Sequence, residues 1–188
     1  MTKNIMIVGV GGQGTLLASR ILGNTVINEG YDVKVSEVHG MSQRGGSVVT
    51  YVKYGNKVHS PIIDRGEADV ILAFELLEAY RAIPYLKDGG KIIINNQHID
   101  PMPVITGAAA YPENIAQKIA ENCDTTVVNA LELAEKAGNF KAVNVVLIGV
   151  MAKTTDIAYE KWIETIKTTV PEKFLDVNIK AFELGYNL

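Results

Sequence analysis

Two glycine-bearing motifs near the start of the chain hold the residue types best suited to bind a ligand. The first motif is Gly9-Val10-Gly11-Gly12-Gln13-Gly14, which fits the pattern G-x-G-x-x-G. Its glycines let the backbone turn sharply and let a phosphate approach the main-chain amides. The amino end of a following helix adds unpaired N–H donors and a partial positive charge. The competing interpretation is a tight strand-to-helix turn that binds nothing.

The second motif, Ser-Glu-Val-His-Gly-Met-Ser-Gln-Arg-Gly-Gly-Ser, occupies residues 36–47. Its guanidinium, at Arg44, can clamp a phosphate or carboxylate through two parallel hydrogen bonds. Glu37 lies 23 residues after Gly14, close to the position of the acidic residue that binds ribose in dinucleotide-binding domains. An ordered polar loop without a ligand is the alternative. The candidate site residues in the two motifs are Gly9, Gly11, Gly12, Gln13, Gly14, Glu37, His39, Gln43, Arg44, Gly45, Gly46 and Ser47.

The elements around these motifs follow the opening pattern of a doubly wound sheet. Residues 5–8 are a continuous apolar run, typical of a buried parallel strand. Apolar residues then recur at helical spacing until Gly30, and Val33 and Val35 mark a second strand. A loop leaving the carboxyl end of that strand is expected to face the glycine loop across one crevice.

The rest of the chain predicts further strands and helices. Residues 47–54 and 57–63 are predicted to pair as a hairpin, which makes the sheet mixed. Strands are expected at residues 69–74, 91–95 and 125–128, a helix from about 75 to 86, a turn at 88–90, and a helix from Pro112 to Asn122. Helical patterns fill most of the remainder. We therefore expect an α/β fold with a three-layer, Rossmann-like doubly wound sheet that includes an antiparallel hairpin.

Composition excludes several classes of function. The net charge is −3 and the basic residues are scattered, which argues against a nucleic-acid partner. With one cysteine, Cys123, the chain cannot supply four thiolates to an iron–sulfur cluster; the simplest interpretation of this thiol is a small buried apolar group. His59 and His98 have no partners at metal-ligand spacing, so no metal site is expected. No stretch approaches the roughly 18 apolar residues of a membrane span, and with no signal peptide we expect a cytoplasmic protein.

Three further side chains are given structural interpretations. Glu75 and Glu78 stand three residues apart on a predicted helix face. A solvated or subunit-facing helix explains them better than an acid–base pair. Trp162 is expected in the core or at an interface.

Taken together, the two motifs resemble those of the gamma-type subunits of 2-oxoacid:ferredoxin oxidoreductases. Within that family the segment Glu-Val-His-Gly-Met-Ser-Gln-Arg-Gly-Gly is most similar to the beta subunits of indolepyruvate-type members, whereas pyruvate and 2-oxoglutarate relatives tend to carry Tyr-Gly-Pro-Glu-x-Arg-Gly-Gly. The resemblance covers residues 1–188 as one gamma-type domain, including residues 144–150 and the closing Val-Pro-Glu-Lys pattern. Thr15 and Ser42 are mild departures from the family pattern.

The resemblance implies a subunit of a complex that oxidatively decarboxylates a 2-oxoacid, indolepyruvate or another aryl pyruvate, to an acyl-coenzyme A in an anaerobic setting. Thiamine diphosphate and 4Fe-4S clusters are then expected on a large partner subunit, because this chain also lacks the Gly-Asp-Gly pattern of a thiamine diphosphate site. Ferredoxin would act through the complex, coenzyme A would be a co-substrate, and this chain would not be active alone.

The expected role of residues 9–14 and 37–47 is a polar crevice against the large subunit that shapes the substrate channel or holds part of coenzyme A. Alanine at Arg44 is then expected to raise the requirement for coenzyme A. Two other functions remain open from the residues themselves. One is an independent NAD- or flavin-binding oxidoreductase, and the other is a nucleotide-sensing module.

Overall fold

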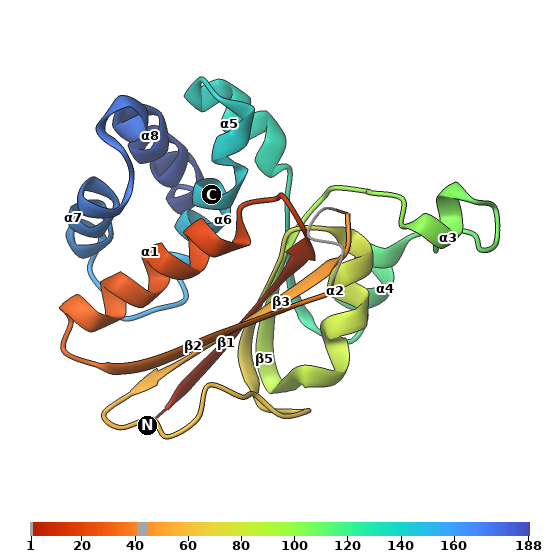
Figure 1. The fold of residues 1–188 in the computed structure, drawn as a ribbon, viewed down its shortest axis with the longest axis horizontal. Coiled ribbons are helices and arrows are strands. Elements are labelled where there is room, and N and C mark those ends of the chain that lie inside the picture. The colour runs from red at the N-terminus through yellow and green to blue at the C-terminus, as the bar shows by residue number, and fades with distance from the viewer. Residues whose placement is uncertain (1, 41–44) are drawn as a thin grey trace.

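A six-stranded mixed sheet runs through the computed structural model, which describes residues 2–40 and 45–188 (Figure 1). The strand order is β2-β3-β1-β4-β5-β6. Strands β1, β4, β5 and β6 are parallel, whereas β3 is antiparallel to both of its neighbours, so β2 points the same way as β1. The strands are β1 (Lys3–Val10), β2 (Asp32–His39), β3 (Ser47–Gly55), β4 (Ala68–Ala73), β5 (Leu86–Asn95) and β6 (Asp124–Val128).

The expected antiparallel hairpin is present, but its two strands are β2 and β3. Their register runs from Asp32 opposite Gly55 to His39 opposite Val48. The predicted pairing of residues 47–54 with residues 57–63 is wrong. Both edges of β3 are already occupied by β1 and β2, and Pro61 in the second segment has no N–H to offer a ladder.

Helices cover both faces of the sheet, as the three-layer prediction requires. On one face α1 (Thr15–Asn28) and α6 (Val143–Ala152) contact the sheet, and α5 (Ala130–Ala137), α7 (Tyr159–Thr169) and α8 (Leu175–Tyr186) pack mainly against these two helices and one another. The other packs against α2 (Leu76–Ala82) and α4 (Ile115–Ala120). Residues 5–8 of β1 are all apolar because their side chains enter both cores alternately: Ile5 and Ile7 enter the first, Met6 and Val8 the second.

Several predicted boundaries shift in the structure. The helix expected over residues 75–86 is α2 followed by the 3-10 turn η1 (Ile83–Tyr85), which holds Pro84. The expected turn at 88–90 is a bulge inside β5, where Gly89 has a φ of 73°. Helix α4 begins after Asn114, whose left-handed backbone stops the helix from extending back to Pro112. The remaining short elements are α3 (Met102–Ile105), η2 (Phe140–Ala142) and η3 (Glu172–Phe174).

Helix α6 is buried on all sides and packs against α8 with their backbones in contact. A Cβ atom added at Gly149 would lie 2.2 Å from the Phe182 carbonyl oxygen. One added at Gly185 would lie 2.0 Å from the Val146 oxygen. Trp162 is fully buried beside Phe182, so of its two predicted environments the structure shows the core. Within the described ranges, no helix combines the length and the apolar character needed to cross a membrane.

Candidate functional site

The two glycine motifs lie side by side at the carboxyl edge of the sheet. Strands β1 and β2 both end at this edge, and β3 begins there. The Gly11 N–H donates to the Gly46 oxygen at 2.8 Å, and the Gly45 N–H donates to the Gly11 oxygen at 3.3 Å. These bonds extend the β1–β3 ladder beyond the strands, so the two motifs form one continuous surface. Of the predicted site residues, Gln43 and Arg44 lie outside the described residues.

The glycine loop presents the amino end of α1 to solvent. Gly12 and Gly14 have φ angles of 104° and 84°, which glycine adopts at little cost. Gly14 is the N-cap of α1 and supplies no side-chain cap. The first N–H groups of a helix lack intrahelical partners, and the helix dipole makes this end partly positive. The loop therefore offers hydrogen-bond donors and a favourable field to an anion.

Two cavities open on either side of this loop, and they share Gly12 and Gly14. The first, named here the β2 crevice, has a volume of about 430 Å³. The second, the η2 crevice, has a volume of about 500 Å³. The β2 crevice is lined by Gly11, Gly12, Gly14, Thr15, Leu16, Glu37, His39 and Val48. The η2 crevice is lined by Gly12, Gln13, Gly14, Gln97, Leu131, Phe140, Lys141 and Val143.

Lys141 and Phe140 are candidate site residues that the sequence did not indicate. They belong to η2 and lie in the η2 crevice with the glycine loop, although about 130 residues separate them from it along the chain. Asn144, one turn further on, donates from Nδ2 to the Gly14 oxygen at 3.3 Å and thereby attaches α6 to the loop. The nearest sequence signal is an aromatic–basic pair just before a largely apolar helix, which is too common to identify a site.

The position of Glu37 differs from that of a ribose-binding acid in a dinucleotide-binding domain. Strand β3 lies between β1 and β2, so Glu37 stands two strand spacings, roughly 9–10 Å, from β1. One Glu37 carboxylate oxygen accepts a hydrogen bond from the Thr50 hydroxyl at 3.3 Å. The other lies 3.5 Å from His39 Nδ1. Glu37 and His39 thus line the β2 crevice together, but the geometry does not favour a bound dinucleotide.

The Gln13 side chain holds the glycine loop in place through hydrogen bonds to neighbouring segments. Its side-chain oxygen accepts from the Val10 N–H at 2.7 Å, and its Nε2 donates to the Phe74 oxygen and to Gln97, both at 3.0 Å. Asn95 donates to the same two acceptors, at 3.1 and 3.0 Å. Because both ends of its amide bond to the protein, Gln13 positions the backbone of the loop, and it also lines the η2 crevice.

Glu75 and Glu78 are buried by other parts of the same chain, so the prediction that they lie on a solvated or subunit-facing helix face is wrong. Glu78 accepts from the Ser47 hydroxyl at 2.5 Å and from Arg81 at 2.7 Å. Glu75, with 1% of its surface exposed, caps α2 by accepting from the Glu78 N–H at 2.9 Å. These hydrogen bonds compensate the desolvation of both carboxylates. Ser47, a predicted site residue, is therefore committed to holding β3 against α2.

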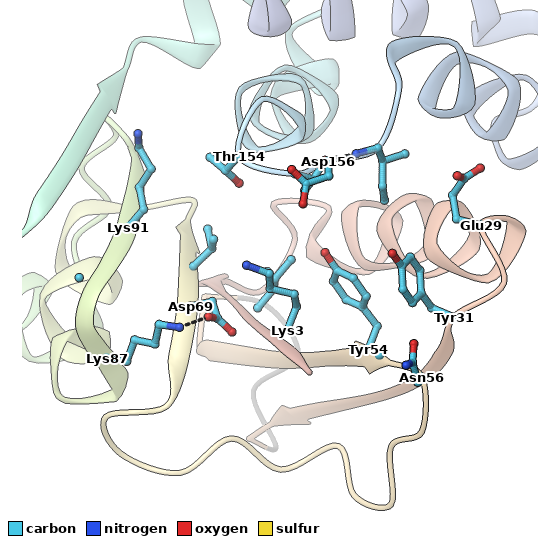
Figure 2. A pocket seen from close by; sticks show the side chains of 16 residues that line it. Lys3, Glu29, Tyr31, Tyr54, Asn56, Asp69, Lys87, Lys91, Thr154 and Asp156 are labelled. Carbon is cyan, nitrogen blue, oxygen red and sulfur yellow. Dashed lines mark hydrogen bonds and ion pairs between the residues drawn. The ribbon is translucent and has the colours of Figure 1, made fainter. Parts of the chain in front are cut away.

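A separate cavity of about 550 Å³ lies at the opposite, amino edge of the strands (Figure 2). Three lysines and three carboxylates line it, and Lys87 pairs with Asp69. Tyr54 meets Tyr31 edge to face with ring centroids 5.5 Å apart. Burial, with smaller contributions from Tyr31 and nearby acids, raises the pKa of Tyr54 to about 12. Since its charges balance and neither glycine motif reaches it, we place the candidate site at the carboxyl edge.

Metal ligation finds no support in the part of the chain that the structure describes. No group of three or more His, Cys, Asp or Glu side chains there could hold a metal ion. The Cys123 thiol is half-buried and packs against the second core.

Comparison with known proteins gives concordant matches. The family model described as pyruvate ferredoxin/flavodoxin oxidoreductase matches residues 4–188. Indolepyruvate oxidoreductase subunit IorB from Pyrococcus horikoshii is 47% identical, over 97% of this chain and 93% of that protein. The gamma subunit of a keto/oxoacid ferredoxin oxidoreductase from Geobacter sulfurreducens has a TM-score of 0.74 at 25% identity, covering 98% of this chain and 96% of that one. The 2-oxoglutarate:ferredoxin oxidoreductase from Magnetococcus marinus, at 17% identity, shares the fold with a TM-score of 0.74, over 99% of this chain and 30% of that one.

Proposed function

Since this chain belongs to the pyruvate ferredoxin/flavodoxin oxidoreductase family, we propose that it works as the gamma-type subunit of a 2-oxoacid:ferredoxin oxidoreductase that accepts indolepyruvate or related aryl pyruvates. The complex oxidatively decarboxylates the 2-oxoacid, transfers the acyl group to coenzyme A and passes the electrons to ferredoxin. Residues 1–188 then form one gamma-type domain, since both cores pack against a single sheet.

The catalytic centres of this complex belong on a partner chain. One cysteine cannot supply the four thiolates of a 4Fe-4S cluster, and no Gly-Asp-Gly pattern of a thiamine diphosphate site occurs. We therefore assign thiamine diphosphate, which supplies the decarboxylation chemistry, and the 4Fe-4S clusters to a large subunit that also delivers electrons to ferredoxin. The free Cys123 is compatible with a reducing cytoplasmic location.

The role proposed for this subunit is to hold part of coenzyme A at the glycine loop. The observation that carries this proposal is the uncapped amino end of α1, which shares the η2 crevice wall with Lys141. Helix amides and an ammonium group together suit the phosphates of coenzyme A. Phe140 and Leu131, both exposed in the same crevice, offer apolar contact to the rest of the molecule.

Exposed apolar side chains around the crevices support contact with the large subunit at this edge. Leu16 borders the β2 crevice, Leu131 and Phe140 border the η2 crevice, and Val38 lies near the end of β2. A concentration of exposed apolar residues marks a surface for binding another protein. Docking there would enclose the crevices between the two subunits.

The test is a reconstitution of this chain with the large subunit, followed by steady-state kinetics with an aryl pyruvate. Lys141→Ala is expected to raise the KM for coenzyme A by about tenfold or more, because a charge-assisted contact is lost, while the KM for the 2-oxoacid stays constant. Lys180→Ala, on the exposed surface of α8, is the matched control. If Lys141→Ala leaves the KM for coenzyme A unchanged, the proposal that the η2 crevice holds coenzyme A is wrong.

A second measurement separates this function from an independent oxidoreductase. A dinucleotide that binds the native chain would raise its melting temperature. We expect no rise in melting temperature with NADH or FAD, because β3 displaces Glu37 from the position of a ribose-binding acid. A clear rise, together with failure to bind the large subunit, would overturn the subunit assignment.

A further inference from the structure

Residues 99–111, called here the arm, form a projection that touches the body of the protein chiefly at its base. The arm carries α3, which stands away from both helical layers in Figure 1. Within the described chain, every hydrogen bond found for residues 101–110 joins two residues of the arm. Examples are the bond from the Ile105 N–H to the Pro101 oxygen at 3.1 Å and that from the Ala109 N–H to the Pro103 oxygen at 3.0 Å. The arm is thus a self-contained turn of chain.

A single buried carboxylate holds both ends of the arm. One oxygen of Glu75 accepts from the Ile99 N–H at 3.1 Å and from the Tyr111 hydroxyl. The Tyr111 hydroxyl oxygen in turn accepts from the Leu77 N–H at 3.1 Å. The ring of His98 stacks on Tyr111 with centroids 3.6 Å apart. The base is therefore fixed by the same residue that caps α2, and the arm has a defined direction.

The side chains that the arm presents are apolar and exposed. Met102 and Ile105 each leave 65% of their surface in solvent, and the arm contains no lysine or arginine and one acid, Asp100. Leaving such groups in water gives up the free energy of their burial. The arrangement is what a preordered binding element requires, since little conformational entropy remains to be lost on docking.

The arm also borders the face already assigned to the large subunit. Met102 and Ile105 line a groove of about 420 Å³ whose opposite wall includes Gly45 and Gly46. Those glycines bond to Gly11 of the glycine loop, so the groove and the crevices form one continuous surface. Among the described residues that line this groove, Arg81 is the basic one, and it is paired with Glu78.

We infer that the arm docks Met102 and Ile105 into an apolar pocket of the large subunit. This inference rests on the proposed function, because it takes the large subunit as the partner. Because the tip of the arm, residues 102–105, carries no charge, it fits an apolar pocket rather than a charged surface. Its continuity with the crevice face favours the large subunit over a second copy of this chain.

The test compares Ile105→Glu with Ile62→Glu in the full chain, measuring the dissociation constant for the large subunit. The two changes are the same, but Ile62, 47% exposed, lies in the loop between β3 and β4 at the amino edge. Ile105→Glu is expected to weaken binding at least about 30-fold, the loss typical of a hot-spot side chain, whereas Ile62→Glu leaves it unchanged. Both isolated variants should keep the wild-type melting temperature, because neither changes a buried group.

Equal binding of wild type and Ile105→Glu would overturn the arm inference and leave the proposed function intact. Failure of the wild-type chain to bind the large subunit would instead overturn the proposed function and the inference with it. Sedimentation velocity supplies a third outcome. If the isolated chain dimerises and Ile105→Glu disperses that dimer without weakening the subunit complex, the arm binds a second copy and the inference is wrong.

Discussion

Replacing Gly149 by alanine tests the helix packing that supports the η2 crevice. Helix α6 follows η2 directly and carries Asn144, whose side chain donates to the Gly14 oxygen. A Cβ atom at position 149 would lie 2.2 Å from the Phe182 oxygen and 2.8 Å from the Tyr186 nitrogen, both backbone atoms of α8. Ordinary contacts of a Cβ atom begin near 3.4 Å, so α6 and α8 must move apart by about 1 Å.

Two opposing contributions set the size of the effect. Alanine favours a helix interior by roughly 0.5–1 kcal/mol over glycine. Overpacking a rigid core costs typically 1–3 kcal/mol, and this clash lies at the upper end because backbone atoms cannot rotate away. We expect Gly149→Ala to lower the free energy of unfolding by about 2 kcal/mol, which corresponds to a fall of about 4–8 °C in Tm for a domain of this size.

The matched control is Gly23→Ala, the same change inside α1. A Cβ atom there would lie 3.8 Å from a methyl group of Val35, an ordinary contact. Only the helix-propensity effect remains, so this variant should gain about 0.5–1 kcal/mol. The two variants are therefore expected to change stability in opposite directions.

Urea unfolding followed by tryptophan fluorescence measures both variants. Trp162 is the chain's single tryptophan and is fully buried beside Phe182 of α8, so its emission reports on this packing. A Gly149→Ala variant as stable as wild type would refute the close α6–α8 contact. Equal losses in the two variants would show that alanine is disfavoured for a reason other than packing.

Two further predictions concern the anchor of the glycine loop and the titration of a buried phenol. Gln13→Leu leaves the Val10 N–H without its partner and removes one of the two donors to the Phe74 oxygen and to Gln97, both of which still accept from Asn95. It should therefore destabilise the chain by about 1–2 kcal/mol and raise the KM for coenzyme A in the reconstituted enzyme. Thermal unfolding and kinetics check this result, and an unchanged Tm would contradict it. The pKa of Tyr54 is raised to about 12 from its usual 10, mainly by burial. Between pH 10 and pH 12 the unfolded chain therefore loses this proton while the folded chain keeps it, and stability falls as pH rises. Urea unfolding between pH 10 and pH 12 should show that the free energy of unfolding falls less steeply with pH in Tyr54→Phe than in wild type, because phenylalanine has no proton to lose. Identical slopes would contradict the raised pKa of Tyr54.

The local pattern of the sequence predicts the parts of the fold that depend on near neighbours. The apolar run of β1, the glycine turn and the helical spacing after Gly14 give β1, the loop and α1 nearly as the structure has them. The shared direction of β1 and β2 was also predicted, and it brings both glycine motifs to one edge. The resemblance that these motifs carry is confirmed by the family match over residues 4–188.

The tertiary structure alone decided which segments meet. The composition of residues 47–54 predicts a strand but does not show which strands pair with it. Only the assembled sheet shows that β3 pairs with β1 and β2. Glu75 and Glu78 look like surface residues in the sequence, yet partners from other segments make their burial stable: Ser47 on β3 for Glu78, and Ile99 and Tyr111 on the arm for Glu75.

The same distinction applies to the candidate site. The glycine motifs are recognisable because phosphate binding needs a backbone geometry that a few adjacent residues encode. Lys141 and Phe140 line the η2 crevice with the first glycine motif only because α6 packs against the sheet and places η2 beside the loop. Periodicity along a chain determines which faces are buried, but the pairing of those faces depends on shape and on partners far away in the sequence. For that reason the sequence could indicate the glycine loop as a candidate site, and the fold was needed to show that η2 lies beside it.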